Sequence, residues 1–211
     1  MRIRHAAPVA SLLCLAATGC TTVSQGEAVP ATTTNDSTTH SSSPPSGDDL
    51  PSHGAPKVND PLDTIRYQHD PCSTLTASQA QEELNLPPQG KPEDVPLGKG
   101  CEWYNADTRG RVNIGILTGN PRGLSGFYEA DQRGEYPYFI PLSPIEGYPA
   151  IAGDVEDRRP RGICIVVVGV TDQLTIQFSL QLSQANVGQV EPCDMAAKVA
   201  GLAMKTMKAG A

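Results

Sequence analysis

The chain has 211 residues, and its 16 Lys and Arg against 23 Asp and Glu give a formal net charge of −7. This acidic balance disfavours nucleic acid as a partner, because affinity for nucleic acid comes mainly from basic contacts to phosphate. It also disfavours electrostatic docking on anionic lipid.

The N-terminus has the layout of a secretory signal with a lipid attachment site. A basic head precedes an apolar run over residues 6–17, which is too short to span a bilayer as a stable helix. The run ends in Ala17-Thr18-Gly19-Cys20, which indicates a lipobox. We therefore expect a lipoprotein signal peptide over residues 1–19 and palmitate-type lipidation of Cys20, which would anchor the secreted chain in the cell membrane on its extracytoplasmic face. The alternative is an ordinary cleaved signal with an accidental cysteine.

The segment after Cys20 differs abruptly in composition. Residues 20–60 are rich in Thr, Ser and Pro and nearly free of large apolar side chains. Such a segment cannot offset the entropy lost on ordering its backbone, so we expect a disordered tether. Residues 61–211 have the length of a single domain with a core of its own.

The first elements predicted in this domain are a helix and two strands. Thr76 and Gln79 have the spacing of a capping box, which predicts a helix that ends before Pro87-Pro88. Residues 101–104 and 112–117 lie on either side of a turn-forming cluster, and this arrangement predicts two strands.

An aromatic-rich stretch follows these strands. Six of the ten aromatic residues of the chain are Phe127, Tyr128, Tyr136, Tyr138, Phe139 and Tyr148. Prolines interrupt the stretch and it lacks helix or strand periodicity, so we expect a long loop. The six rings are candidates for a binding surface, because tyrosine combines contact area with a polar tip. The alternative is that the rings cover the core beneath the loop.

A charged cluster comes next in the chain. Three acidic residues are followed by three arginines: Asp154, Glu156, Asp157, Arg158, Arg159 and Arg161. We interpret the cluster as mutual neutralisation on a solvated loop. The alternative is a metal or acid/base site, although the segment matches no calcium-loop spacing.

The last part of the chain predicts a hairpin and a helix. Residues 163–170 form a continuous β-branched run, whereas residues 174–182 alternate between apolar and polar side chains. The short connection between them predicts an antiparallel hairpin, and residues 192–207 predict an amphipathic helix. The expected fold class is therefore α+β, an antiparallel sheet of about four or more strands packed with an N-terminal and a C-terminal helix.

The four cysteines of the domain predict two disulfides, because exported proteins fold in an oxidising compartment. Among the three possible connectivities, the hairpin geometry favours Cys164–Cys193, and Cys72–Cys101 then follows by elimination. The rival connectivity joins Cys72 to Cys193 and Cys101 to Cys164. A zinc site is disfavoured, because the sequence contains no C-x-x-C pair and no histidine at ligand spacing. We expect no metal and no cofactor.

No catalytic constellation stands out in the sequence. The histidines are His5, His40, His53 and His69, none of which lies inside the expected fold, so a Ser-His-Asp or Cys-His site would lack its general base. Ser125 is expected to cap a helix start and not to act as a nucleophile. Carboxylates are plentiful, but nothing singles out a glycosidase pair. We therefore predict no catalytic residues.

Three cysteine-containing segments carry a family resemblance. They are Asp70-Pro71-Cys72-Ser73-Thr74-Leu75-Thr76, Gly100-Cys101-Glu102-Trp103 and Glu191-Pro192-Cys193-Asp194, joined by Gly147-Tyr148-Pro149-Ala150. With the lipobox and tether, the chain resembles the actinobacterial exported lipoproteins of the domain of unknown function 3558. Glu191 departs from the Asp that usually opens the last motif. The resemblance implies an envelope lipoprotein of an actinobacterium and supplies no catalytic residues.

The sequence favours a non-enzymatic binding or accessory module held at the cell envelope. Its membrane contact would be the lipid anchor, and its partner an envelope protein or an apolar ligand, with no nucleic acid. One alternative is a carrier of a lipid or small apolar molecule, whose pocket the aromatic loop would line. The other is a carboxylate-dependent cell-envelope hydrolase.

Overall fold

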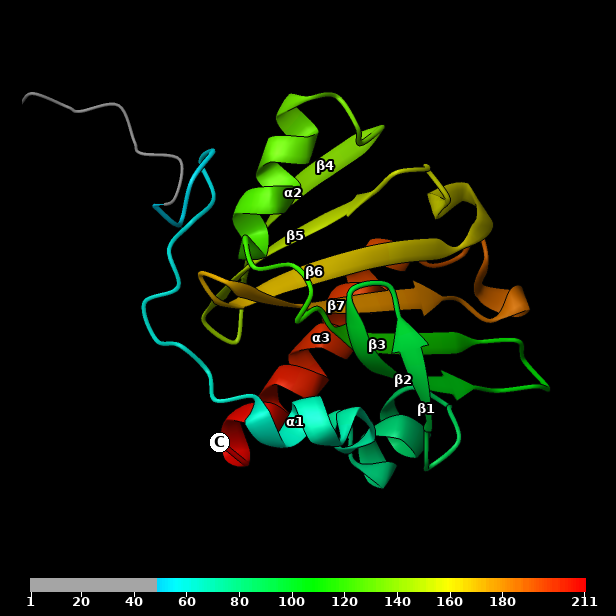
Figure 1. Ribbon diagram of the computed structural model, residues 1–211. Helices are drawn as coiled ribbons and strands as arrows, with labels where there is room; N and C mark the ends of the chain where they lie inside the picture. Colours follow the sequence, from blue (N-terminus) through cyan, green and yellow to red (C-terminus); the bar gives the residue numbers. More distant parts are fainter. Residues whose placement is uncertain (1–48) are drawn as a thin grey trace, which may run out of the picture. The chain divides into compact units, whose positions relative to one another are not determined.

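The computed structural model describes residues 49–211, which form a seven-stranded antiparallel sheet with helices on both faces (Figure 1). The strand order is β1-β2-β3-β7-β6-β5-β4. The strands are β1 (Lys91–Val95), β2 (Gly98–Tyr104), β3 (Arg111–Ile116), β4 (Tyr138–Ile145), β5 (Tyr148–Asp154), β6 (Ile163–Thr171) and β7 (Leu174–Gln181). The helices are α1 (Ile65–His69), α2 (Gly123–Gln132) and α3 (Pro192–Ala209), with short helical turns η1 (Pro71–Thr74), η2 (Gln79–Glu83), η3 (Arg159–Arg161) and η4 (Gln184–Asn186). The α+β class and the antiparallel sheet are confirmed.

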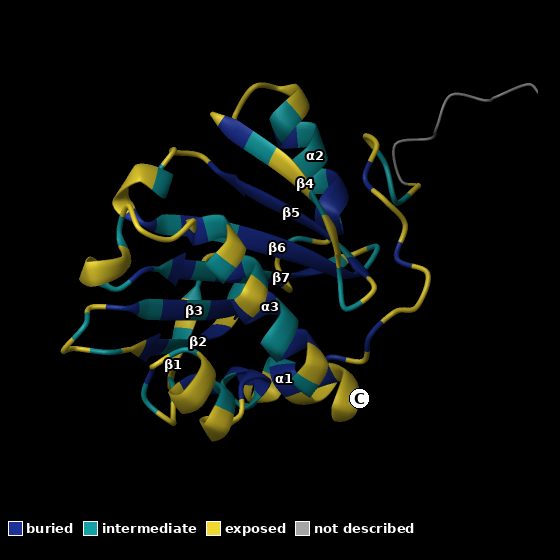
Figure 2. Cartoon of the chain, turned by 180° about the vertical axis from the view of Figure 1, so that it is seen from behind, coloured by how far each residue is buried: buried dark blue, intermediate teal, exposed yellow. Residues whose placement is uncertain are grey.

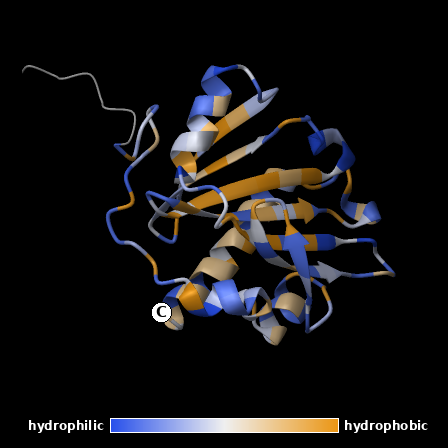
Figure 3. Cartoon of the chain, in the orientation of Figure 1, coloured by the Kyte–Doolittle hydropathy of each residue, from blue (hydrophilic) through white to orange (hydrophobic). Residues whose placement is uncertain are grey.

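The main core lies between the sheet and α3, which crosses the face seen in Figure 2. Trp103, Phe178 and Met204 are at most 1% exposed there. The β6–β7 hairpin forms where the sequence predicted it, and β6 is hydrophobic along its length (Figure 3) because it is a central strand. The capping box is also present: the Thr76 N–H donates to Gln79 Oε1 (2.9 Å), and the Gln79 N–H donates to Thr76 Oγ1 (3.2 Å).

The opposite face of the sheet is covered in part by α2 and by the incoming segment around Ala55 (Figure 1), whereas Val58 already packs in the main core. Ala55 and Leu124 form a second, smaller apolar cluster there with two residues of the sheet. The Ser52 N–H donates to Ser125 Oγ, and the Val58 N–H donates to Asp172 Oδ1, both at 2.8 Å. Residues 49–60 therefore pack on the fold, so the boundary expected at residue 61 was placed too late.

The long loop expected across the aromatic stretch is wrong. Residues 123–154 form α2 and the β4–β5 hairpin. Pro141 and Pro144 are tolerated because β4 is an edge strand, whose outer N–H groups need no partner within the sheet. Ser125 does not cap α2 either. It lies inside the helix, 1% exposed, and its hydroxyl accepts the Ser52 N–H.

The two predicted disulfides are both present. Cys72–Cys101 joins η1 to β2, and Cys164–Cys193 joins β6 to α3, with Cα atoms 5.0 and 5.1 Å apart. Each bond connects a strand to the helical layer of the main core.

No helix among residues 49–211 is long and apolar enough to cross a membrane. The signal peptide, Cys20 and the tether up to residue 48 lie outside the described residues.

Candidate functional site

The six aromatic residues of the candidate binding surface lie on two sides of the sheet. The rings of Tyr128 and Phe139 form a T-shaped pair with centroids 4.9 Å apart, and the Tyr136 ring centroid lies 6.0 Å from that of Phe139. With Phe127, these half-buried rings pack around α2 and the second cluster. Tyr148 instead belongs to the main core, and the ring of Tyr138 is buried beside Cys164. The sequence set therefore does not form one surface, and most of its area is used in packing.

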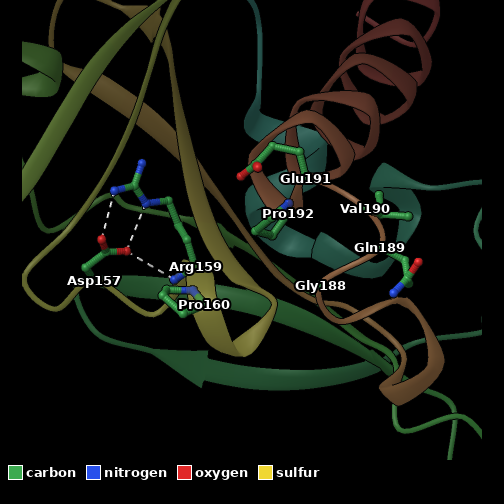
Figure 4. A pocket seen from close by; sticks show the side chains of 8 residues that line it. All are labelled: Asp157, Arg159, Pro160, Gly188, Gln189, Val190, Glu191 and Pro192. Atoms are coloured by element: carbon green, nitrogen blue, oxygen red, sulfur yellow. Dashed lines mark hydrogen bonds and ion pairs between the residues drawn. The ribbon is translucent and has the colours of Figure 1, made fainter.

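A pocket of about 470 Å³ opens near Tyr138, at the end of the sheet where β6 begins (Figure 4). Its walls are two connections: the one from β5 to β6, which contains η3, and the one from η4 to α3. The lining residues are Asp157, Arg159, Pro160, Gly188, Gln189, Val190, Glu191 and Pro192.

The Cys164–Cys193 disulfide fixes the relative position of these two walls. Cys164 is the second residue of β6, just after the first connection, and Cys193 lies in the first turn of α3, just after the second. The Tyr138 hydroxyl also lies 4.0 Å from Cys164 Sγ. Because both walls end at one covalent link, the pocket is preorganised by the fold.

Arg159 is the best-fixed charged side chain of the pocket. Its Nε and Nη2 each donate to the Asp157 carboxylate at 2.8 Å, and the Asp157 Oδ1 also accepts the Arg159 N–H (Figure 4). The guanidinium carbon lies 4.0 Å from the centroid of the Tyr138 ring. This bidentate and stacked arrangement is one that arginine, but not lysine, can adopt.

The same contacts determine the protonation of these groups. The hydrogen bond from the Arg159 side chain lowers the pKa of Asp157 below its ordinary value of 3.8. Asp157 in turn raises the pKa of Arg159, and the nearby charge of Glu191 adds to that shift. Burial raises the pKa of Tyr138, and the charge of Asp154 raises it further. At neutral pH the pocket therefore holds a charged pair and neutral tyrosine.

Each carboxylate of the 154–161 cluster is neutralised by one arginine. Arg158 contacts Asp154 at 2.6 Å, Arg159 contacts Asp157 at 2.8 Å, and Arg161 contacts Glu156 at 2.7 Å. The predicted mutual neutralisation is confirmed, but the predicted solvated loop does not include Asp154, which is the buried last residue of β5. An ionised, bidentately bound Asp157 is a poor general acid, so this geometry supports recognition better than acid/base catalysis.

The connection over residues 187–191 was not expected to form a site, because its only recognisable feature in the sequence is Glu191 at the start of a family segment. The only sequence feature that brings it next to η3 is the predicted Cys164–Cys193 bond. The structure also places an exposed valine on each wall: Val155 is 72% exposed and Val190 is 36% exposed. Within residues 49–211, no group of three or more His, Cys, Asp or Glu side chains has the arrangement of a metal site.

Comparison with known proteins gives one finding. A family model described as Protein of unknown function (DUF3558) matches residues 15–206. Neither a curated protein nor a solved structure matches the chain.

Proposed function

The chain belongs to the family described as Protein of unknown function (DUF3558), and from that premise we propose that it is an envelope-anchored lipoprotein whose folded part binds a partner protein. The binding site in this proposal is the pocket between residues 157–160 and 188–192. No chemical transformation is part of the proposed role.

The observation that supports the proposal best is where the pocket lies relative to the incoming chain. Val58 bonds to Asp172, at the end of the sheet where β6 finishes, whereas the pocket lies at the end where β6 begins. The nine residues of β6 separate these ends by about 30 Å at roughly 3.3 Å per residue. Figure 1 shows the incoming segment and the η3–η4 end on opposite sides of the fold. The pocket therefore lies at the end of the fold opposite the point where the tether enters, so the anchor leaves it accessible.

The chemistry of the pocket rim suits a protein partner. Val190 lines the pocket and offers an exposed apolar contact, and Pro160 and Pro192 stiffen the two walls. Val155 is an exposed residue of the same connection as Pro160 but does not line the pocket. Arg159 is held in one orientation by Asp157 and Tyr138, so little side-chain entropy is lost when a partner contacts it. Arginine and preorganised apolar side chains are frequent energetic centres of protein interfaces.

The geometry supports the two alternative functions, a lipid carrier and a hydrolase, less well. The space between α3 and the sheet is filled by fully buried side chains such as Trp103, Phe178 and Met204, and a pocket beside Leu182 has only about 80 Å³, room for a few waters. A lipid carrier would need more room in that layer. A hydrolase would need a carboxylate with a raised pKa, whereas Asp157 has a lowered one.

Site-directed photocrosslinking in intact cells tests this proposal. A benzoylphenylalanine residue at Val190 should give one protein adduct of defined mass, whereas the same group at Ile65, which is 63% exposed on α1, should not. Arg159→Gln should reduce the adduct at position 190 several-fold without changing the amount of folded chain. Cys20→Ser, which removes the lipidation site, should abolish the adduct by releasing the chain from the membrane. Equal adducts at positions 190 and 65, or an adduct indifferent to Arg159→Gln, would contradict the proposal.

A further inference from the structure

The sheet face that α2 covers only in part carries a row of polar side chains away from the pocket. These side chains, here called the polar platform, are Lys91, Glu93, Glu102, Arg111, Asn113, Gln177, Ser179 and Gln181. They come from the adjacent strands β1, β2, β3 and β7, and most are half-buried. Figure 3 shows the resulting contrast between hydrophilic β1 and hydrophobic β6.

The register of the strands places six of the platform residues side by side, whereas Glu93 and Gln177 are opposite Gly100 and Gly115. Asn113 is opposite Ser179, and Arg111 is opposite Gln181. On the far side of β3, Asn113 is opposite Glu102. Because adjacent strands lie about 4.8 Å apart, these side chains form rows with hydrogen-bonding groups at a regular spacing. Their backbone is held in a sheet, so the spacing is fixed before any ligand binds.

The charges of the platform are balanced within it. Arg111 Nε lies 3.2 Å from Glu102 Oε2, and the Asn113 amide donates to Glu93 Oε1 at 2.6 Å. Lys91 is opposite Glu102 in the register, so two basic side chains accompany two acidic ones. The platform therefore attracts neither a polyanion nor a polycation.

The glutamines of the platform leave binding capacity free. The side-chain amides of Gln177 and Gln181 make no hydrogen bond to other residues within the described part of the chain. At the edge of the platform, the Tyr104 ring lies 4.7 Å from the Arg111 guanidinium carbon, with the residue 38% exposed.

We propose that the polar platform binds a neutral glycan chain, an inference that goes beyond the proposed protein-binding function and uses a different surface. Amide, carboxylate and guanidinium groups at regular spacing can donate to and accept from the paired hydroxyls of a sugar ring. An exposed tyrosine can pack against the C–H face of such a ring. A protein partner fits this surface less well, because the centres of protein interfaces are depleted in Lys, Glu and Ser.

Calorimetric titration of the full chain in detergent micelles tests the inference, with neutral hexasaccharides of glucose, galactose, arabinose and N-acetylglucosamine as probes. We expect at least one probe to bind. Gln177→Leu combined with Gln181→Leu should weaken binding by about tenfold, equal to about 1.4 kcal/mol. Both substitutions keep side-chain size and break no internal hydrogen bond, so folding should be unchanged by circular dichroism.

Gln184→Leu is the matched control, because Gln184 is an exposed glutamine of η4 outside the platform. It should leave the affinity unchanged. Absence of binding by all four probes overturns the inference, and so does an affinity that the Gln177/Gln181 double variant does not change. Neither result bears on the crosslink at Val190, so failure of the platform is distinguishable from failure of the proposed function.

Discussion

Asp157 is a single residue whose protonation reports on the candidate pocket. Its folded pKa is depressed by Arg159, so the contact contributes stability above the ordinary pKa of 3.8, and that contribution is lost as the pH falls through the lower folded value. Arg159→Gln should therefore raise the pKa of Asp157 toward 3.8. Carboxyl-carbon NMR across pH 2 to 6, a window of about two units on either side of that value, measures this shift.

Lys198→Gln is the control for this titration, because Lys198 pairs with Glu83 at a different surface of the molecule. It should leave the Asp157 curve unchanged. An Asp157 that titrates at the same pH with and without Arg159 would show that the pair does not exist in solution and that Asp157 is available for acid/base chemistry.

Side-chain hydrogen bonds differ in whether they can be predicted from the sequence. The Thr76–Gln79 capping box was predictable because both partners lie within one turn of chain. The further bonds of Gln79 were not: its Nε2 donates to Leu202 O at 3.0 Å, and Thr206 Oγ1 donates to its Oε1 at 2.9 Å. Those contacts depend on how η2 packs on α3, which no local pattern encodes.

At the scale of elements, the start of α2 depends on one glycine. Gly123 has φ +52°, and a Cβ there would clash with the Asp172 carbonyl in the turn of the β6–β7 hairpin. Gly123→Ala should therefore destabilise the fold by about 1–3 kcal/mol, because both the left-handed backbone and the backbone contact are incompatible with a side chain. Chemical denaturation with intact disulfides measures the change.

Gly201→Ala is the matched substitution inside a helix. Gly201 lies in α3 with open space where the Cβ would be, so alanine should stabilise the fold by about 0.4–1 kcal/mol. The two changes are chemically identical and should have opposite signs. Destabilisation of similar size at both positions would show that the close approach of α2 to the hairpin turn is not part of the native state.

The elements that the sequence predicted and those that it missed differ in their place in the sheet. The β6–β7 hairpin was predictable because central strands bury their side chains and show a strong apolar pattern. β4 and β1 are the two edge strands and contain Pro141 and Pro92, so their composition suggests loops. The missed strand β4 begins with Tyr138, the residue of the aromatic stretch whose ring packs against Arg159 of the pocket.

At the scale of the whole molecule, the disulfide connectivity was predictable because each bond joins two cysteines that follow one another in the sequence of the domain. Both bonds close segments of the same sequence separation, 29 residues, and the two segments do not overlap. The hairpin returns the chain beside Cys164 just before Cys193, so its geometry alone favoured that pair. The pocket was not predictable in the same way, because neither the charged cluster of one wall nor the Glu191-Pro192 segment of the other indicates that the two connections face each other across a cavity.

The N-terminal boundary of the fold could not be predicted from composition. Residues 49–60 read as tether because they are polar, yet Ala55 and Val58 are buried and this segment bonds to Ser125 and Asp172. A chain that begins at residue 49 should be as stable as the full chain. A chain that begins at residue 61 should lose about 2 kcal/mol or more, because it exposes the second apolar cluster and breaks these bonds.

Hydrogen exchange locates the effect of this truncation, since amides of α2 should exchange faster while those of β6 and β7 change only with global stability. A point variant separates packing from chain length: Val58→Ala should destabilise the fold by about 1 kcal/mol, whereas Lys57→Ala at the exposed neighbouring position should have no effect. Equal stability of the chains that begin at residues 49 and 61 would show that residues 49–60 belong to the tether and do not stabilise the fold. In that case α2 would be held on the sheet by Leu124 and its own neighbours alone, and the incoming chain would have no defined path along the face opposite α3.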